Sequence, residues 1–298
     1  MSQTQLAATA SATRNRLALI ALLAGGIAIG GSPIFVRLSE IGPMATAFWR
    51  VALALVPLFV FFRATERRQV PGPEGVGDMM ALALPGVFLA GDLIAWHVSI
   101  HMTTVANATL LTNLAPVFVT AVGWLFLGAS ISRAFMIGLL IAIVGIVVLK
   151  GGLSGLSAGN PAGDGLAIVA AMFYAGYMLS IARLRGRFDT VRVMLWSTLS
   201  AAVCLLPVAI LTESQFFPVT IFGWAMLLGL ALITHAGGQL AITYALAYLP
   251  TAFSSLTLLL QPVVAALLGV AVLGEVVTGT QAIGGMIVLC GILYARRQ

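Results

Sequence analysis

The sequence predicts an all-α polytopic membrane protein with ten transmembrane helices, arranged as two inverted five-helix repeats. Of its 298 residues, 60% are hydrophobic and 8% are charged, whereas a soluble domain carries roughly 25% charged residues. Lipid must therefore be its solvent, because one soluble core cannot hide so much apolar chain. A repeat is indicated because residues 90–117, AGDLIAWHVSIHMTTVANATLLTNLAPV, return in a rough copy at residues 236–263, an offset of 146.

Ten segments are apolar enough for membrane helices, which need about 20 such residues. They cover residues 17–36, 44–62, 79–101, 105–127, 134–149, 165–183, 193–211, 226–248, 251–273 and 281–295. The eighth belongs to a longer apolar run, 219–249, and we expect a re-entrant or interfacial lead-in to it from Phe216. Residues 1–16 are expected to form a cytoplasmic tail that is disordered up to Ala12.

Basic residues lie mostly on one side of this topology. If the N-terminus is inside, the cytoplasmic segments hold twelve arginines and the outer side holds only Arg37 and Lys150, while Arg50 lies within the second span. Cytoplasmic loops of membrane proteins are rich in Lys and Arg, so both termini are predicted to be cytoplasmic. The net charge of +6 is explained in this way, and no basic face interleaved with aromatic residues indicates nucleic-acid binding.

The 146-residue offset divides the chain into two repeats. We expect the first at 17–150, an extracellular linker at 151–163 and the second repeat at 164–298. Each repeat holds five spans, and because five is odd the second copy enters the membrane upside down. Inverted repeats are typical of secondary transporters, whose substrate site lies near the midplane between the halves.

Two matched prolines and two matched glycine pairs fall inside spans. Pro116 and Pro262 each remove a backbone hydrogen bond and should bend their helices; we interpret them as hinges, with a rigid packing kink as the alternative. The glycine pairs Gly138 with Gly145 and Gly284 with Gly291 are each seven residues apart and indicate close helix packing. Dimerisation through these faces is the alternative.

Polar residues inside the spans are the candidate substrate-binding residues. Asp92 is the only acid deep in a span, and Trp96 and Ser99 share its helix face. A charge there should face a cavity or a partner, so Asp92 is predicted to meet a substrate amine or a proton; capping a neighbouring kink is the alternative. The other candidates lie on polar or aromatic stripes: Asn113, Tyr174, Tyr177, His235, Gln239 and Gln261. Together the stripes favour a wet central cavity over interhelical hydrogen bonding alone.

Signatures of enzymes are missing from the sequence. It contains no H-E-x-x-H metal helix, no G-x-S-x-G nucleophile motif and no G-x-x-x-x-G-K-[ST] phosphate loop. We therefore expect no catalytic residues, no metal site and no cofactor, and no direct use of ATP.

The ten spans in two inverted repeats, the prolines of spans four and nine, and Leu273-Gly274-Glu275 after span nine resemble the drug/metabolite transporter superfamily, EamA type, over residues 17–295. The first repeat departs from the pattern, with Gly128-Ala129 where the family often has Gly-Glu. Among relatives, the chain is most similar to bacterial aromatic amino acid exporters. The resemblance implies amino acid export across the bacterial inner membrane, with spans one, three, four, six, eight and nine lining the cavity and spans five and ten behind.

The function predicted is a secondary transporter that exports amino acids, aromatic and other neutral ones, by alternating access. The alternatives are export of drugs, nucleosides or other small metabolites on the same fold, and a membrane enzyme or scaffold. Proton antiport and uniport both remain open. The partners expected are an amino acid substrate and the lipid bilayer, and the protein is expected to be a monomer, with a dimer as the alternative.

Overall fold

The computed structural model describes residues 3–65, 72–103, 105–149, 151–152, 160–274 and 278–296. Within those ranges the chain forms helices and turns and contains no strand. The helices are α1 (Gln3–Gly30), α2 (Ser32–Arg37), α3 (Pro43–Thr65), α4 (Val76–Met102), α5 (Val105–Thr112), α6 (Ala115–Leu127), α7 (Arg133–Leu149), α8 (Pro161–Leu184), α9 (Thr190–Thr212), α10 (Ile221–Gly229), the π-helix η2 (Leu230–Gln239), α11 (Leu240–Ala245), α12 (Thr251–Thr257), α13 (Leu260–Leu273) and α14 (Gly279–Ala295).

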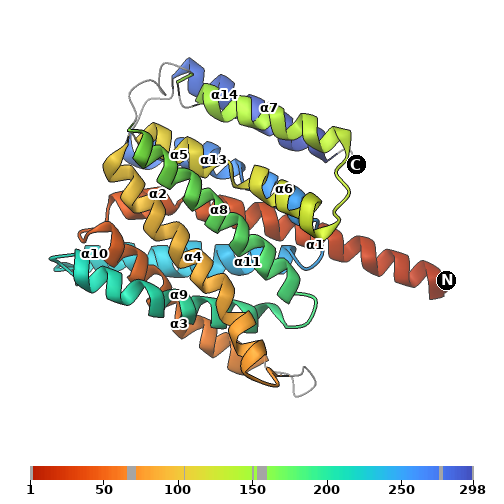
Figure 1. The fold of residues 1–298 in the computed structure, drawn as a ribbon, viewed down its shortest axis with the longest axis horizontal. Helices are drawn as coiled ribbons and strands as arrows, with labels where there is room; N and C mark the ends of the chain where they lie inside the picture. The colour runs from red at the N-terminus through yellow and green to blue at the C-terminus, as the bar shows by residue number, and fades with distance from the viewer. Residues whose placement is uncertain are drawn as a thin grey trace.

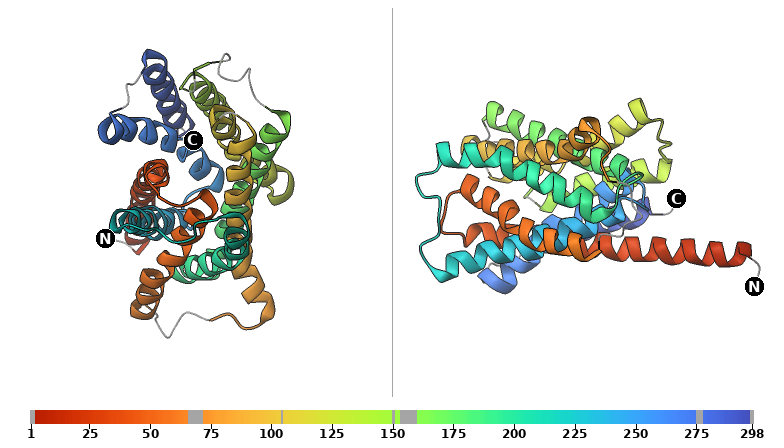
Figure 2. Two further views of the ribbon diagram at one scale, coloured as in Figure 1. Left: turned by 90° about the vertical axis from the view of Figure 1, so that its left-hand side faces the viewer. Right: turned by 90° about the horizontal axis from the view of Figure 1, so that it is seen from below.

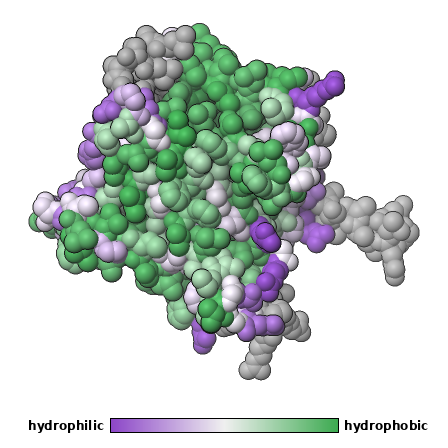
Figure 3. Space-filling model, in the orientation of Figure 1, coloured by the Kyte–Doolittle hydropathy of each residue, from purple (hydrophilic) through white to green (hydrophobic). Residues whose placement is uncertain are grey.

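Eight helical segments in the described ranges are long and apolar enough to cross a membrane. Two further apolar helices, α7 and α14, have 17 residues each. On the face of the bundle that Figure 3 shows, most residues are hydrophobic and the hydrophilic ones lie toward the margins. The chain is therefore a multi-pass membrane protein.

Two expectations about helix boundaries are wrong. The N-terminal tail is not disordered up to Ala12, since α1 begins at Gln3 and extends beyond the rest of the bundle (Figure 2); four of the residues from 3 to 12 are alanine, the strongest helix former. The eighth span runs from Ile221 to Ala245 instead of 226–248. It starts early because the Thr220 side chain accepts a hydrogen bond from Gly223 N and caps the helix. The residues before it form an irregular link in which Phe216 packs on Trp49, not a re-entrant helix.

The predicted bends at Pro116 and Pro262 are confirmed. The helix stops at Thr112 and resumes at Ala115, and in the second half it stops at Thr257 and resumes at Leu260. Each break comes just before its proline, which lies in the first turn of the new helix. An N–H group there has no partner within the helix, so its absence costs no hydrogen bond. Hinge motion at these breaks stays a prediction.

The helix boundaries repeat along the chain. α7 and α14 are offset by 146 residues at both ends, and α5 and α12 begin at the same offset. In space, α4 packs against α8 and α9, and α3 packs against α9. The largest apolar core lies among these helices and includes Leu89, Tyr177 and Leu205. α7 and α14 lie side by side along one edge of the bundle (Figure 1).

The glycine faces of α7 and α14 pack against each other. A Cβ atom added to Gly291 would lie 2.6 Å from Ala142 N and 2.7 Å from Gly138 O. One added to Gly145 would lie 2.6 Å from Val288 N. Only a hydrogen atom fits in place of a side chain at these positions. The glycines lie on the predicted packing faces and bring two helix backbones together within one molecule.

We expect Gly291→Ala to destabilise the protein by about 1–3 kcal/mol, because the added methyl group overpacks the contact between α7 and α14. The measurement is the apparent melting temperature in detergent. Gly165→Ala is the matched control, since Gly165 is also helical and a Cβ there meets no atom within 4 Å; it should be neutral or slightly stabilising. Equal melting temperatures for both variants would contradict the close packing.

Candidate functional site

A small cavity lies where helices from the two halves of the chain meet. Its volume is about 20 Å³, room for about one water molecule. The lining comes from α2, α3, α4 and η2 and consists of Ser32, Val36, Thr46, Ala47, Arg50, Leu93, Trp96, His97 and Leu230. It therefore joins a charged group, hydroxyls, an imidazole and an indole inside an apolar bundle.

Arg50 is the charged residue of this lining, and the sequence predictions gave it no role. It lies on α3, where Nη1 donates to Ser32 Oγ at 3.3 Å while Nε is buried with no hydrogen-bond partner. It interacts electrostatically with Tyr174, Asp92 and Tyr177. A basic residue in the middle of an apolar span was the signal that could have identified it, since such residues face a cavity or a partner.

Asp92 and Trp96 lie one turn apart on α4. Asp92 is 8% exposed, and its Oδ1 atom is buried with no hydrogen-bond partner. Trp96 lines the cavity and meets the ring of His97 edge-on at a centroid distance of 4.9 Å. Ser99 departs from the predicted cavity wall, because its hydroxyl donates to Gly163 O at 2.8 Å and joins α4 to α8.

Tyr174 and Tyr177 stack on each other on α8, with ring centroids 5.9 Å apart. Tyr174 lies close to the side chains of Gln239 and Gln261 and interacts electrostatically with Asp92 and Arg50. Tyr177 is only 1% exposed. It belongs to the apolar core, and its hydroxyl points to Met194 Sδ at 4.0 Å. Both tyrosines interact with Arg50 and Gln239, and Tyr174 also interacts with Asp92 and Gln261.

The second half of the chain contributes polar groups from η2 and α13. His235 is buried, with Nε2 2.9 Å from Thr198 Oγ1 on α9, and it interacts electrostatically with Arg50. Gln239 Oε1 and Gln261 Nε2 are both buried with no hydrogen-bond partner. The π-helical turn that carries His235 and Gln239 was not predicted; π-helical turns are rare and frequently found at functional sites.

The remaining predicted residues lie at the helix breaks and outside the lining of the small cavity. Asn113 occupies the break between α5 and α6, Pro116 starts α6, and Pro262 lies in the first turn of α13. Among the described residues, no group of three His, Cys, Asp or Glu side chains is arranged to hold a metal ion.

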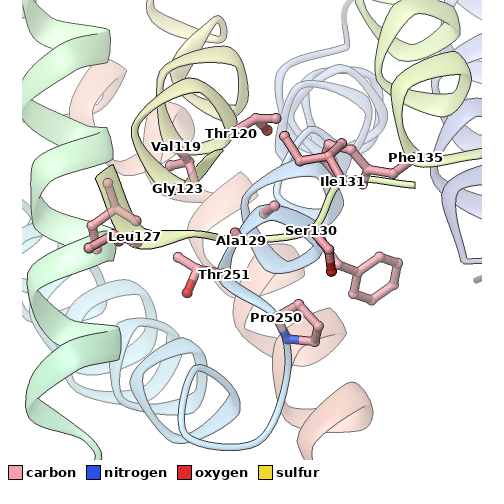
Figure 4. A pocket seen from close by; sticks show the side chains of 13 residues that line it. Val119, Thr120, Gly123, Leu127, Ala129, Ser130, Ile131, Phe135, Pro250 and Thr251 are labelled. Atoms are coloured by element: carbon pink, nitrogen blue, oxygen red, sulfur yellow. The ribbon is translucent and has the colours of Figure 1, made fainter. Parts of the chain in front are cut away.

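A larger cavity of about 200 Å³ lies away from these charges. It is formed by the end of α6, the link that follows it and the start of α12, with Thr251 and Pro250 on one side and Leu127 and Ala129 on the other (Figure 4). None of the predicted site residues lines it. Its lining includes no charged side chain, whereas Arg50 lines the small cavity.

Loops join distant helices at both ends of the bundle. At one end, Glu40 accepts hydrogen bonds from Val219 N and Thr220 N, both at 3.1 Å, and from the Thr220 hydroxyl, and Glu213 Oε1 accepts one from Met44 N at 2.8 Å. Carboxylates so placed stabilise the starts of α10 and α3. At the other end, Arg187 pairs with Asp78 at 3.0 Å. Both ends of the bundle therefore hold contacts between elements far apart in sequence.

Comparison with known proteins identifies the family. The sequence model of the EamA-like transporter family matches residues 16–150 and again residues 161–297. The chain belongs to this family. A solved crystal structure superposes with a TM-score of 0.80 at 19% identity, covering 96% of this chain and 98% of its own, which shows the same fold.

Three curated relatives of this EamA-like chain are named as exporters or transporters. The probable terminal-alkyne amino-acid exporter of Streptantibioticus cattleyicolor is 28% identical over 76% of this chain and 78% of its own. An uncharacterized transporter of Archaeoglobus fulgidus is 24% identical over 93% of this chain and 96% of its own. The pseudopaline exporter of Pseudomonas aeruginosa is 28% identical over 67% of each chain. A transporter role follows, with a small molecule as the substrate.

The cap at Glu40 should make stability depend on pH in the acidic range. The bonds from the Thr220 hydroxyl and backbone lower the pKa of Glu40 below its usual 4.5. A lowered pKa stabilises the folded state above the usual value, and that contribution is lost as the pH falls through the lowered pKa. We expect wild type to melt above Glu40→Gln at neutral pH, and the difference to shrink below about pH 4.5. Glu74→Gln, a change at an exposed acid before α4, should show no such convergence; a pH-independent difference for Glu40→Gln would contradict the charged cap.

Proposed function

We propose that this chain is a secondary transporter that exports amino acids, aromatic and other neutral ones, across the bacterial inner membrane by alternating access. The observation that carries the proposal is the small cavity lined by Arg50 and Trp96, with Asp92 interacting electrostatically with Arg50 from α4, so that two charges and an aromatic surface are combined in one region. A ligand with charged groups and an apolar side chain suits that combination. The amino-acid exporter among its relatives supports the same class of substrate.

The substrate-binding residues we propose are those predicted from the sequence. The ring of Trp96 holds the apolar side chain, with Tyr174 and Tyr177 behind it. The polar groups of Asp92, Asn113, His235, Gln239 and Gln261 meet the amino and carboxylate groups. The breaks before Pro116 and Pro262 act as hinges, because they interrupt two spans that occupy equivalent places in the two repeats.

The architecture proposed is ten transmembrane helices in two inverted repeats, with both termini in the cytoplasm. The repeating helix boundaries and the two ranges matched by the family support the division into repeats. α7 and α14 are counted as spans because their 17 residues reach the lower limit for crossing a bilayer. Their glycine faces are used inside one molecule, which supports a monomer. The small volume of the cavity, about 20 Å³, supports an occluded state.

Export of another metabolite is the second candidate. The pseudopaline exporter of Pseudomonas aeruginosa matches two thirds of the chain, and its name indicates a different cargo. The two candidates differ in which solutes compete for transport, so one substrate panel separates them.

The test uses the purified protein in liposomes, with labelled phenylalanine, leucine, threonine and a nucleoside, each with and without a pH gradient. We expect flux of the amino acids with mutual competition, and no flux of the nucleoside. A rate that follows the imposed gradient favours proton antiport, and an unchanged rate favours uniport. Flux of the nucleoside and none of the amino acids would move the assignment to the second candidate.

Trp96→Ala should lower phenylalanine flux by about tenfold, since an aromatic contact is worth up to about 1.5 kcal/mol and tenfold corresponds to 1.4 kcal/mol. Threonine flux should fall less, because its small side chain makes less contact with the indole. Trp124→Ala is the matched control, since Trp124 is 61% exposed on α6. Equal losses for the two variants would remove Trp96 from the site.

A further inference from the structure

We propose that Arg50 and Asp92 form a clamp for a zwitterion, in which Arg50 binds the carboxylate of the substrate and Asp92 binds its ammonium group. The inference rests on the proposed amino acid export and narrows the substrate to molecules that carry both charges. It gives a specificity-determining role to Arg50, which lies on α3 beside the small cavity.

The guanidinium of Arg50 has donors to spare. An arginine offers five N–H donors in a planar fork that matches a carboxylate. Among the described residues one donor is used, from Nη1 to Ser32 Oγ at 3.3 Å, and Nε is buried without a partner. Leaving a buried donor of a charged group unsatisfied is costly. The group is therefore arranged to receive an acceptor that the protein itself does not supply.

Asp92 carries the charge opposite to that of Arg50, yet it does not supply the acceptor that Arg50 Nε lacks. The two groups interact electrostatically across the site. Asp92 Oδ1 is buried without a hydrogen-bond partner, as is Arg50 Nε. Had the two side chains formed a side-on bidentate pair, through Nε and one Nη atom, both atoms would be satisfied. Instead, α3 holds the Arg50 cation and α4 holds the Asp92 anion, and each keeps one buried hydrogen-bonding atom without a partner.

The other unpartnered atoms follow the same division. Gln261 Nε2 is a donor and Gln239 Oε1 is an acceptor, and both are buried without partners. Tyr174 interacts with all four groups, the two glutamines and the two charged side chains, which indicates that they lie in one region. The site thus offers two donors for a carboxylate and two acceptors for an ammonium group. His97 lines the cavity and its Nε2 is also unpartnered; because Nδ1 donates to Leu93 O at 2.6 Å, Nε2 of the neutral ring is an acceptor and can serve the ammonium group.

Charge balance explains why a zwitterion fits better than an ion of one sign. The clamp is neutral overall and stays neutral when an amino acid bridges it. A ligand with only an ammonium group would leave Arg50 buried without a counter-charge. A ligand with only a carboxylate would leave Asp92 buried without one. Breaking one side of a buried pair is strongly destabilising, so ligands with one charge should be rejected.

The first experiment needs no variant. Full-length protein in liposomes transports labelled phenylalanine, and three unlabelled competitors of similar shape are compared: phenylalanine, phenethylamine and 3-phenylpropionate. We expect phenylalanine to compete at least about 100-fold better than either single-charge analogue, the loss expected when one buried charge is left unpaired.

The second experiment exchanges the charges one at a time. Arg50→Gln leaves an acidic site, so the affinity for phenethylamine should rise relative to that for phenylalanine. Binding of each ligand is measured by the shift in melting temperature of the protein in detergent. Asp92→Asn leaves a basic site, so 3-phenylpropionate should gain instead. Arg50→Lys keeps the charge and should retain the wild-type order. A residue that only supports the fold would weaken all three ligands equally.

The outcomes separate the clamp from the export function. Phenylalanine flux with equal competition by phenethylamine overturns the clamp and leaves amino acid export standing. No flux of any neutral amino acid, with the protein folded by size exclusion, overturns both. Opposite shifts in ligand preference for Arg50→Gln and Asp92→Asn support the clamp, even where those variants transport poorly, because binding is read without turnover.

Discussion

The burial of an arginine side chain among lipid-solvated helices is the constraint on which the central arrangement depends. A charge at membrane depth must face protein or water. Around Arg50, this requirement is met by Ser32 from α2, by Asp92 from α4 and by the phenol of Tyr174 from α8. Side chains from three helices, drawn from both halves of the chain, therefore interact with one guanidinium, which lines the small cavity.

The irregular stretches of backbone belong to the same region of the molecule. The breaks before Pro116 and Pro262 and the π-helical segment η2 all interrupt spans that contribute to the site or adjoin it. Irregular backbone in a membrane is tolerated where it is buried in protein or lines a water-filled cavity. α7 and α14 are the contrast: they run as unbroken helices whose glycines lock them together at the edge of the bundle. The unbroken helices thus lie at the edge of the bundle, and the interrupted spans adjoin the site.

The predicted site residues differ in how closely the structure brings them to the cavity. Trp96 lines it, and Asp92, Gln239 and Gln261 carry the unpartnered atoms near it, whereas Tyr177 packs in the core and His235 is held by Thr198. Helix periodicity shows which residues share a face of one helix. It does not show which neighbour that face meets, so a polar side chain bonded to another helix and one open to a cavity look alike in sequence.

By itself, the sequence determined the membrane class, the 146-residue repeat and the bends at Pro116 and Pro262. These are properties of composition and of local backbone bonding, which need no knowledge of distant contacts. Only the tertiary structure decided that Arg50 lies beside Asp92 and Tyr174, that Glu40 caps α10, and that η2 is π-helical. Each of these depends on the approach of segments far apart in the chain or on the packing of a helix against its neighbours, and neither is encoded in the spacing of residues along one helix.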